Sequence, residues 1–190
     1  MINFTVYCGS RPGSKPAYER AARLLGETMA AHSVGLTYGG ATVGLMGTVA
    51  RAVQRGGSRV VGVMPNVLTD REITNNDATE MIHVDSMHER KQMMFERGDA
   101  FIALPGGPGT MEEWFEMWTW AKIGQHTRPI ALLNIDGFYD PLLQFLQTME
   151  REGFVSPTER EMIIVETDPV QLVQRLMTGG IVHDSLTTSS

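Results

Sequence analysis

The chain has 190 residues, of which 42% are hydrophobic and 20% are charged, a composition typical of a globular protein rather than a disordered one. Its formal net charge of -6, without any cluster of lysine or arginine, argues against a protein that binds nucleic acid through phosphate contacts. No apolar stretch approaches the roughly 20 residues needed to span a bilayer, and the single cysteine, Cys8, permits no internal disulfide. We therefore expect a cytoplasmic protein without nucleic-acid or membrane partners, whose ligand is a small molecule.

Strands and helices are predicted to alternate along the chain. Short apolar runs predict strands at residues 2–8, 34–38, 59–64, 80–84, 99–104, 129–134 and 162–165. Apolar residues at helical spacing predict helices at residues 16–32, 86–97, 139–152 and 169–177, through residues 49–53, and from Thr110 onward. The polar residues 69–79 are expected to form a loop with a helical turn. We expect one nucleotide-binding domain, residues 1–180, and a flexible C-terminal tail, residues 181–190.

This alternation predicts an α/β fold, a Rossmann-like, doubly wound, mainly parallel sheet flanked by helices on both faces. Turns that contain glycine follow three of the predicted strands, after Cys8, Tyr38 and Leu104. The carboxyl ends of parallel strands meet at one edge of a sheet, and ligands of such sheets bind at that edge. We therefore expect the three turns to face one ligand.

Residues 99–113 carry the clearest local pattern, a strand, a turn of proline and glycine, and the start of a helix. Thr110 is expected to be the N-cap of this helix, with Glu113 three residues later as its capping-box partner. The glycines let the backbone approach a ligand, and the helix N-terminus favours a phosphate or carboxylate. On the residues alone, the capping role of Glu113 is favoured over a role with substrate.

The glycine pattern also limits the class of ligand. The first turn lacks Gly-x-Gly-x-x-Gly and the second strand does not end in an acidic residue, as a dinucleotide site requires. No Gly-Lys-Ser/Thr is present for a nucleoside triphosphate. The residues thus point to a mononucleotide or a sugar phosphate. The candidate phosphate-binding residues of the first two turns are Gly9, Ser10, Gly39, Gly40, Gly44 and Gly47.

Residues 105–113, which read Pro-Gly-Gly-Pro-Gly-Thr-Met-Glu-Glu, resemble the PGGxGTxxE motif of the LOG (Lonely Guy) family, the cytokinin riboside 5'-monophosphate phosphoribohydrolases. The segments that also look like the family are residues 8–10, 39–47, 71–74, 87–91 and 132–154, so the resemblance spans about residues 3–178. The motif alone is shared with molybdenum-cofactor carrier proteins. Together with Met-His-Glu-Arg-Lys at residues 87–91, it is typical of the LOG family.

The resemblance implies a homodimeric enzyme that hydrolyses the bond between an adenine, typically N6-substituted, and ribose 5'-monophosphate, releasing the free base and ribose 5-phosphate. Arg90 and Glu113 are implied as the catalytic pair. The substrate-binding residues that it implies are Glu72, Arg90, Lys91, Gly107, Pro108, Gly109, Thr110, Met111, Glu112, Glu113 and Thr119. Pro108 fills the variable position of the motif, where proline removes one backbone amide donor.

The chemistry of such a reaction suits these two side chains. Breaking a ribosyl N-glycosidic bond builds positive charge on the sugar, as in other glycoside hydrolyses, and a carboxylate such as Glu113 stabilises that charge. A guanidinium such as Arg90 stays charged at working pH and can hold phosphate or ribose oxygens. On the predicted helix, Met87, Arg90, Lys91 and Met94 share one face. We expect that face to turn toward the ligand.

Several alternatives stay open on the sequence alone. The protein could be a non-catalytic carrier of a phosphorylated cofactor such as molybdopterin, and Lys91 could in principle form a Schiff base, since lysine decarboxylase is a label this family has carried. No spacing typical of metal ligands is present, so we expect neither a metal nor a cofactor. Glu112 and Glu116 are expected to be solvated helix charges. The residues expected in the core or an interface are Trp114, Trp118 and Trp120.

Overall fold

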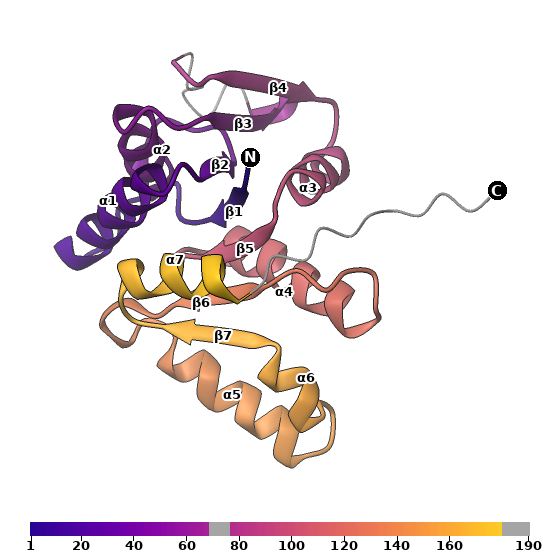
Figure 1. Ribbon diagram of the computed structural model, residues 1–190. Helices are drawn as coiled ribbons and strands as arrows, with labels where there is room; N and C mark the ends of the chain where they lie inside the picture. The colour runs from indigo at the N-terminus through magenta and orange to yellow at the C-terminus, as the bar shows by residue number, and fades with distance from the viewer. Residues whose placement is uncertain (69–76, 180–190) are drawn as a thin grey trace.

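The computed structural model describes residues 1–68 and 77–179, so Glu72 and the predicted tail at residues 181–190 lie outside the described residues. Within the described ranges, seven strands form one sheet in the order β4-β3-β2-β1-β5-β6-β7, and neighbouring strands are parallel. The strands are β1 (Asn3–Tyr7), β2 (Gly35–Tyr38), β3 (Val60–Pro65), β4 (Glu80–Val84), β5 (Ala100–Ala103), β6 (Ile130–Leu133) and β7 (Ile163–Glu166). The predicted α/β fold with a parallel sheet is confirmed (Figure 1).

Helices join the strands and cover the sheet. They are α1 (Pro16–Ala31), α2 (Gly44–Arg55), α3 (Met87–Glu96), α4 (Pro108–Lys122), α5 (Asp140–Arg151), α6 (Pro157–Glu161) and α7 (Pro169–Thr178). Short 3-10 helices follow two strands, η1 (Asn66–Leu68) and η2 (Ile135–Gly137). None of the helices in the described part of the chain has the length and apolar character needed to cross a membrane.

The central strands of the sheet are buried on both faces, whereas the edge strands β4 and β7 are mostly half-buried. Along β1, Phe4 and Val6 pack into one core cluster, which includes residues of α1, α2 and α7. Tyr7 points the other way, into a second cluster with residues of α3, α4 and α5. Because side chains alternate across a strand, a run that is apolar at every position fits a sheet between two layers of helices. The predicted helices on both faces are therefore confirmed (Figure 1).

The strand order reverses between β1 and β5, and this reversal positions the site. From β1 the chain builds outward through β2, β3 and β4, and from β5 it builds in the opposite direction through β6 and β7. The loops after β1 and β5 therefore leave the sheet edge on opposite sides and open a crevice between them. The three glycine-containing turns follow β2, β1 and β5, which are adjacent, so the expectation that they share one edge is confirmed.

Some element bounds differ from the prediction. Helix α2 already begins at Gly44, within the stretch expected to be a turn. Helix α6 was not predicted, although Ser156 and Glu159 form a complete capping box there and Pro157 occupies the first turn. Its five residues are too few to give a helical apolar pattern, so only the cap could have indicated it.

Helices α1 and α2 pack closely because small residues face each other where they meet. A Cβ atom added to Gly26 would lie 2.6 Å from the Cβ of Ala52 and 2.7 Å from the carbonyl oxygen of Val49. Real Cβ atoms do not approach that closely, and neither neighbour is the end of a flexible side chain. A side chain at position 26 would therefore push the two helices apart.

We predict that Gly26→Ala destabilises the protein. Alanine is the better helix former by about 1 kcal/mol, but overpacking of this kind costs about 1–3 kcal/mol. Urea denaturation should show a lower free energy of unfolding for Gly26→Ala and a change within about 0.5 kcal/mol for the exposed Glu27→Ala control. Unchanged or increased stability of Gly26→Ala would contradict the close packing of α1 on α2.

Candidate active site

A cavity of about 430 Å³ opens in the crevice between the ends of β1 and β5. Its walls are the end of β1 and the turn after it, Gly39 after β2, the first turn of α3, the first two turns of α4, and one side chain of α2. The lining residues are Val6, Tyr7, Cys8, Gly9, Ser10, Arg11, Gly39, Met46, Met87, Arg90, Gly107, Pro108, Gly109, Thr110, Glu112 and Glu113. A hollow of similar volume, about 460 Å³, is lined by α1 and α2 residues, away from the strand ends where ligands of parallel sheets bind.

The N-cap of helix α4 lies three residues earlier than the sequence pattern indicates. Gly107 is its N-cap and Pro108 occupies the first turn, where a proline ring has a suitable φ and the missing amide is not needed. Thr110 is therefore inside the helix, and the predicted capping box of Thr110 with Glu113 is wrong. The Glu113 carboxylate is not used for capping and is available to the cavity that it lines.

Arg90 is buried and held by backbone carbonyl groups. Its Nε donates to the carbonyl oxygen of Val63 at 3.1 Å, and its Nη2 donates to that of Gly39 at 2.9 Å. The helix that carries it begins at an N-cap, Ser86, whose hydroxyl accepts from the amide of Glu89. These contacts fix the plane of the guanidinium and leave Nη1 directed at Glu113, 3.8 Å from its Oε1.

Glu113 is a nearly buried carboxylate with an altered pKa. Only 12% of its side chain is exposed. Burial raises the pKa of Glu113 from 4.5 to about 7, while the charge of Arg90 acts in the opposite direction and lowers it by less. A carboxyl group with a pKa near 7 exchanges its proton readily at neutral pH, which suits a general acid or base in a cavity.

Lys91 pairs with two carboxylates of the neighbouring helix. Its Nζ lies 2.5 Å from Oε1 of Glu112 and 3.1 Å from Oε1 of Glu116. Burial alone would lower the pKa of Lys91, but the hydrogen bonds to both glutamates outweigh it and the pKa is raised. Glu112 is 54% exposed, as expected of a solvated helix charge, but it also pairs with Lys91. For Glu116, which is 23% exposed, the prediction of a solvated charge is wrong, because the lysine on α3 could not be located from the sequence of α4.

The cavity brings together part of the predicted set. The predicted residues that line it are Gly9, Ser10, Gly39, Arg90, Gly107, Pro108, Gly109, Thr110, Glu112 and Glu113. The predicted residues that are described but do not line it are Gly40, Gly44, Gly47, Lys91, Met111 and Thr119. Gly44 and Gly47 instead allow α2 to pack tightly, against the backbone of Ser10 and Thr42 respectively. Glu72 lies outside the described residues.

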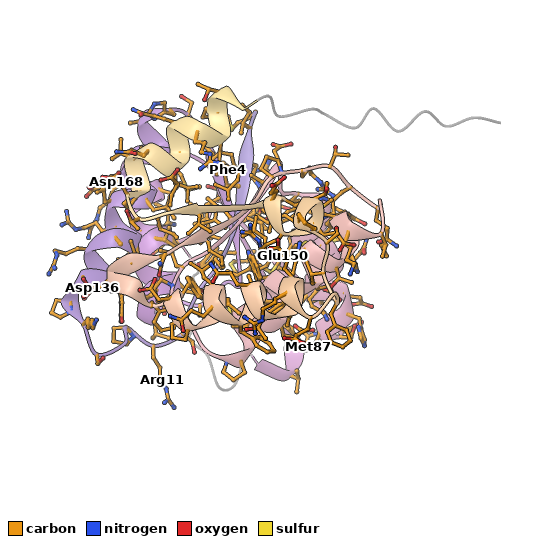
Figure 2. All side chains as sticks on the ribbon, turned by 90° about the horizontal axis from the view of Figure 1, so that it is seen from below. Phe4, Arg11, Met87, Asp136, Glu150 and Asp168 are labelled. Carbon is orange, nitrogen blue, oxygen red and sulfur yellow. The ribbon has the colours of Figure 1, made fainter. Side chains whose placement is uncertain are left out.

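Cys8, Arg11 and Met46 also line the cavity, although no site role was predicted for them. Cys8 and Arg11 flank the predicted turn after the first strand, so their position along the chain was a usable signal. Burial raises the pKa of the Cys8 thiol, which therefore stays protonated at neutral pH. Figure 2 shows the exposed Arg11 side chain extending outward from its turn. Met46 belongs to the first turn of α2, a helix that the sequence pattern predicted only through residues 49–53.

Comparisons with known proteins agree in the family they indicate. A family described as "Possible lysine decarboxylase" matches residues 46–176. The chain is 44% identical over 183 residues to the cytokinin riboside 5'-monophosphate phosphoribohydrolase LOG3 of Arabidopsis thaliana, covering 96% of this chain and 85% of the relative. It is 47% identical over 179 residues to the Arabidopsis thaliana enzyme LOG2, covering 94% of this chain and 84% of the relative.

Solved structures with the same fold are more distant in sequence. The molybdenum cofactor binding protein from Rippkaea orientalis superposes with a TM-score of 0.70 at 18% identity, covering 93% of this chain and 98% of that chain. The molybdenum cofactor carrier protein from Chlamydomonas reinhardtii gives a TM-score of 0.69 at 19% identity, with coverage of 93% and 98%. These likenesses show the fold alone.

We predict that Glu113→Gln stabilises the protein at pH 8 but not at pH 5. Because the pKa is raised in the folded state, from 4.5 to about 7, the glutamate contributes stability below pH 4.5 that is lost as pH rises through 7. This difference in pKa corresponds to about 3 kcal/mol of folding stability at most. Thermal denaturation at both pH values should give Glu113→Gln a higher Tm only at pH 8.

The matched control is Glu161→Gln, which removes an exposed carboxylate of α6. Its Tm should follow that of the wild type at both pH values, within the small effect typical of surface substitutions. An increase in Tm for Glu113→Gln that is equal at pH 5 and pH 8 would contradict a raised pKa at Glu113.

Proposed function

This chain belongs to the LOG family of cytokinin riboside 5'-monophosphate phosphoribohydrolases, and we propose that it hydrolyses the N-glycosidic bond of N6-substituted adenosine 5'-monophosphates. The products are the free base, an active cytokinin, and ribose 5-phosphate. One observation carries the proposal, the Arg90 and Glu113 side chains 3.8 Å apart beside the glycine-rich start of α4. The two relatives named for this activity are 44% and 47% identical to this chain over 183 and 179 aligned residues.

The 5'-phosphate is expected to bind at the N-terminus of α4. Gly109 and Thr110 belong to its first turn, whose amide groups have no acceptor within the helix, and the helix dipole favours an anion there. Pro108 supplies no amide, so the phosphate contacts at that point come from its neighbours. Gly9, Ser10 and Gly39 line the same cavity and allow the ligand close to the backbone.

Glu113 is proposed to act on the ribose ring and the attacking water. As the bond from the anomeric carbon to the base breaks, positive charge develops on the sugar, and an ionised carboxylate stabilises it. The same carboxylate can accept a proton from water as the water oxygen bonds to the anomeric carbon, while the base leaves with the bonding electron pair and takes up a proton. Arg90 holds its charge throughout and fixes ribose or phosphate oxygens.

The other readings are less well supported. A pyridoxal-phosphate decarboxylase needs a lysine that becomes a neutral amine, and Lys91 does not fit because two glutamates raise its pKa. The carrier reading has its support in fold likeness at 18–19% identity, which says nothing about activity. A reaction in the cytoplasm fits the buried free thiol of Cys8, because thiols stay reduced in that compartment.

We predict release of free base from isopentenyladenosine monophosphate and AMP, but not from the unphosphorylated riboside. Chromatography of the products should show kcat/KM rising with pH to a plateau above about 7, since the ionised form of Glu113 is the active one. Glu113→Gln should lower kcat on the order of 10²–10⁴-fold, and Glu161→Gln should leave it unchanged. No base from any of the three compounds, with binding retained, would favour the carrier.

We also propose that the enzyme is a homodimer that uses the exposed side of α4. Met111, Phe115 and Ile123 recur at four- and eight-residue spacing on this helix and its C-cap. The first two pack against the second core cluster but stay partly exposed, and Ile123 is 62% exposed. Thr119 is exposed on α4 and does not line the cavity of its own chain, although the family resemblance implies a substrate contact. A second copy packed on α4 would bring Thr119 near the partner's site.

We predict that light scattering after size exclusion gives the mass of a dimer for the wild type and of a monomer for Ile123→Asp. A charge buried without a partner in an interface costs several kcal/mol, enough to dissociate a moderate dimer. Val67→Asp, at an exposed position on η1, is the control and should stay dimeric. A monomeric wild type at micromolar concentration would refute the dimer.

A further inference from the structure

Lys91 follows Arg90 on α3, yet its ammonium group does not line the cavity. Only 11% of its side chain is exposed, and both of its carboxylate partners, Glu112 and Glu116, belong to α4. The two glutamates lie one helical turn apart, and like charges at that spacing repel each other. The positive charge of Lys91 contacts both glutamates. It therefore offsets the repulsion between Glu112 and Glu116 and joins α3 to α4.

We propose that Lys91 is a positioning residue, which holds α3 against α4 so that Arg90 and Glu113 face each other across the cavity. This inference rests on the proposed hydrolase function. Arg90 lies on α3 beside Lys91, and Glu113 lies on α4 beside Glu112, so the lysine contacts flank the catalytic pair on both helices. The two glutamates engage two of the three ammonium donors of Lys91, and the ammonium group is turned toward them and not toward the cavity.

The charge of Lys91 also acts on Glu113. The groups that face Glu113 are Arg90 and Lys91 from α3, Glu112 and Glu116 from its own helix, and Tyr7 and Cys8 from the end of β1. Burial raises the pKa values of Cys8 and Tyr7, so both stay neutral at neutral pH. Arg90 and Lys91 lower the pKa of Glu113, and Glu112 and Glu116 raise it. Without Lys91, Arg90 would be the one positive charge among these groups that lowers the pKa of Glu113, against two carboxylates that raise it.

The test compares Lys91→Met with the wild type in base release from AMP across pH 5–9. A positioning residue predicts that the rising limb of kcat/KM moves to higher pH by roughly half a unit or more, that kcat falls, and that KM at the plateau changes less than about threefold. Lys91→Arg should restore both, because a guanidinium can bridge two carboxylates. Lys122→Met, which removes an α4 lysine paired with Glu159, should leave the profile unchanged.

Glu116→Gln should shift the pH profile of kcat/KM in the opposite direction. It removes a charge that raises the pKa of Glu113, so the limb should move to lower pH. A KM that rises tenfold or more in Lys91→Met, with the limb unmoved, would overturn the proposal and make Lys91 a substrate ligand. Lys91→Arg guards against a variant that fails to fold, since it keeps the charge.

A second readout does not depend on activity. Carbon-13 NMR titration of the Glu113 carboxyl group, assigned with Glu113→Gln, should give a higher midpoint in Lys91→Met than in the wild type. Equal midpoints would refute the effect of Lys91 on Glu113 whether or not base is released. A wild type that releases no base, with the midpoints different, would instead refute the hydrolase function and leave the link between the two helices standing.

Discussion

The crevice depends on one buried guanidinium. Charge is costly to bury unless hydrogen bonds satisfy it, and Arg90 meets that condition by donating to the carbonyl groups of Val63 and Gly39. The Val63 carbonyl lies within β3 and the Gly39 carbonyl directly after β2, the neighbouring strand, so the arginine fixes the start of α3 against this part of the sheet. A side chain at Gly39 would collide with the guanidinium, which accounts for glycine there. The remaining guanidinium nitrogen, Nη1, faces the carboxylate of Glu113 on α4.

The distance between Arg90 and Glu113 serves reactivity more than stability. At 3.8 Å the two groups attract each other but lie beyond an ordinary hydrogen bond, so the attraction does not repay the desolvation of the carboxylate. The pKa of Glu113 is consequently near 7 and not low, as a tight bidentate pair would make it. A looser pair keeps the carboxyl group able to exchange a proton and leaves both charges accessible to ligand oxygens in the cavity.

Features that depend on nearby residues were predictable from the sequence, and features that depend on distant ones were not. Periodicity located the strands because parallel strands buried on both faces are short apolar runs, and the turns after Cys8, Tyr38 and Leu104 do share one edge. The capping box at Thr110 failed because Pro108 competes for the first turn and starts the helix earlier. The partners of Glu112 and Glu116 lie on another helix, and no local pattern reports that contact.

The glycines show why a motif predicts a fold more securely than a contact. Gly9 and Gly39 line the cavity, whereas Gly44 and Gly47, from the same family-like segment as Gly39, serve the packing of α2. Close approach to a ligand and close approach to another backbone demand the same residue, so sequence cannot separate them. The pKa of Glu113 is a second property that the motif does not predict. It is near 7 because the carboxyl group is buried, and burial depends on residues from several elements of the fold.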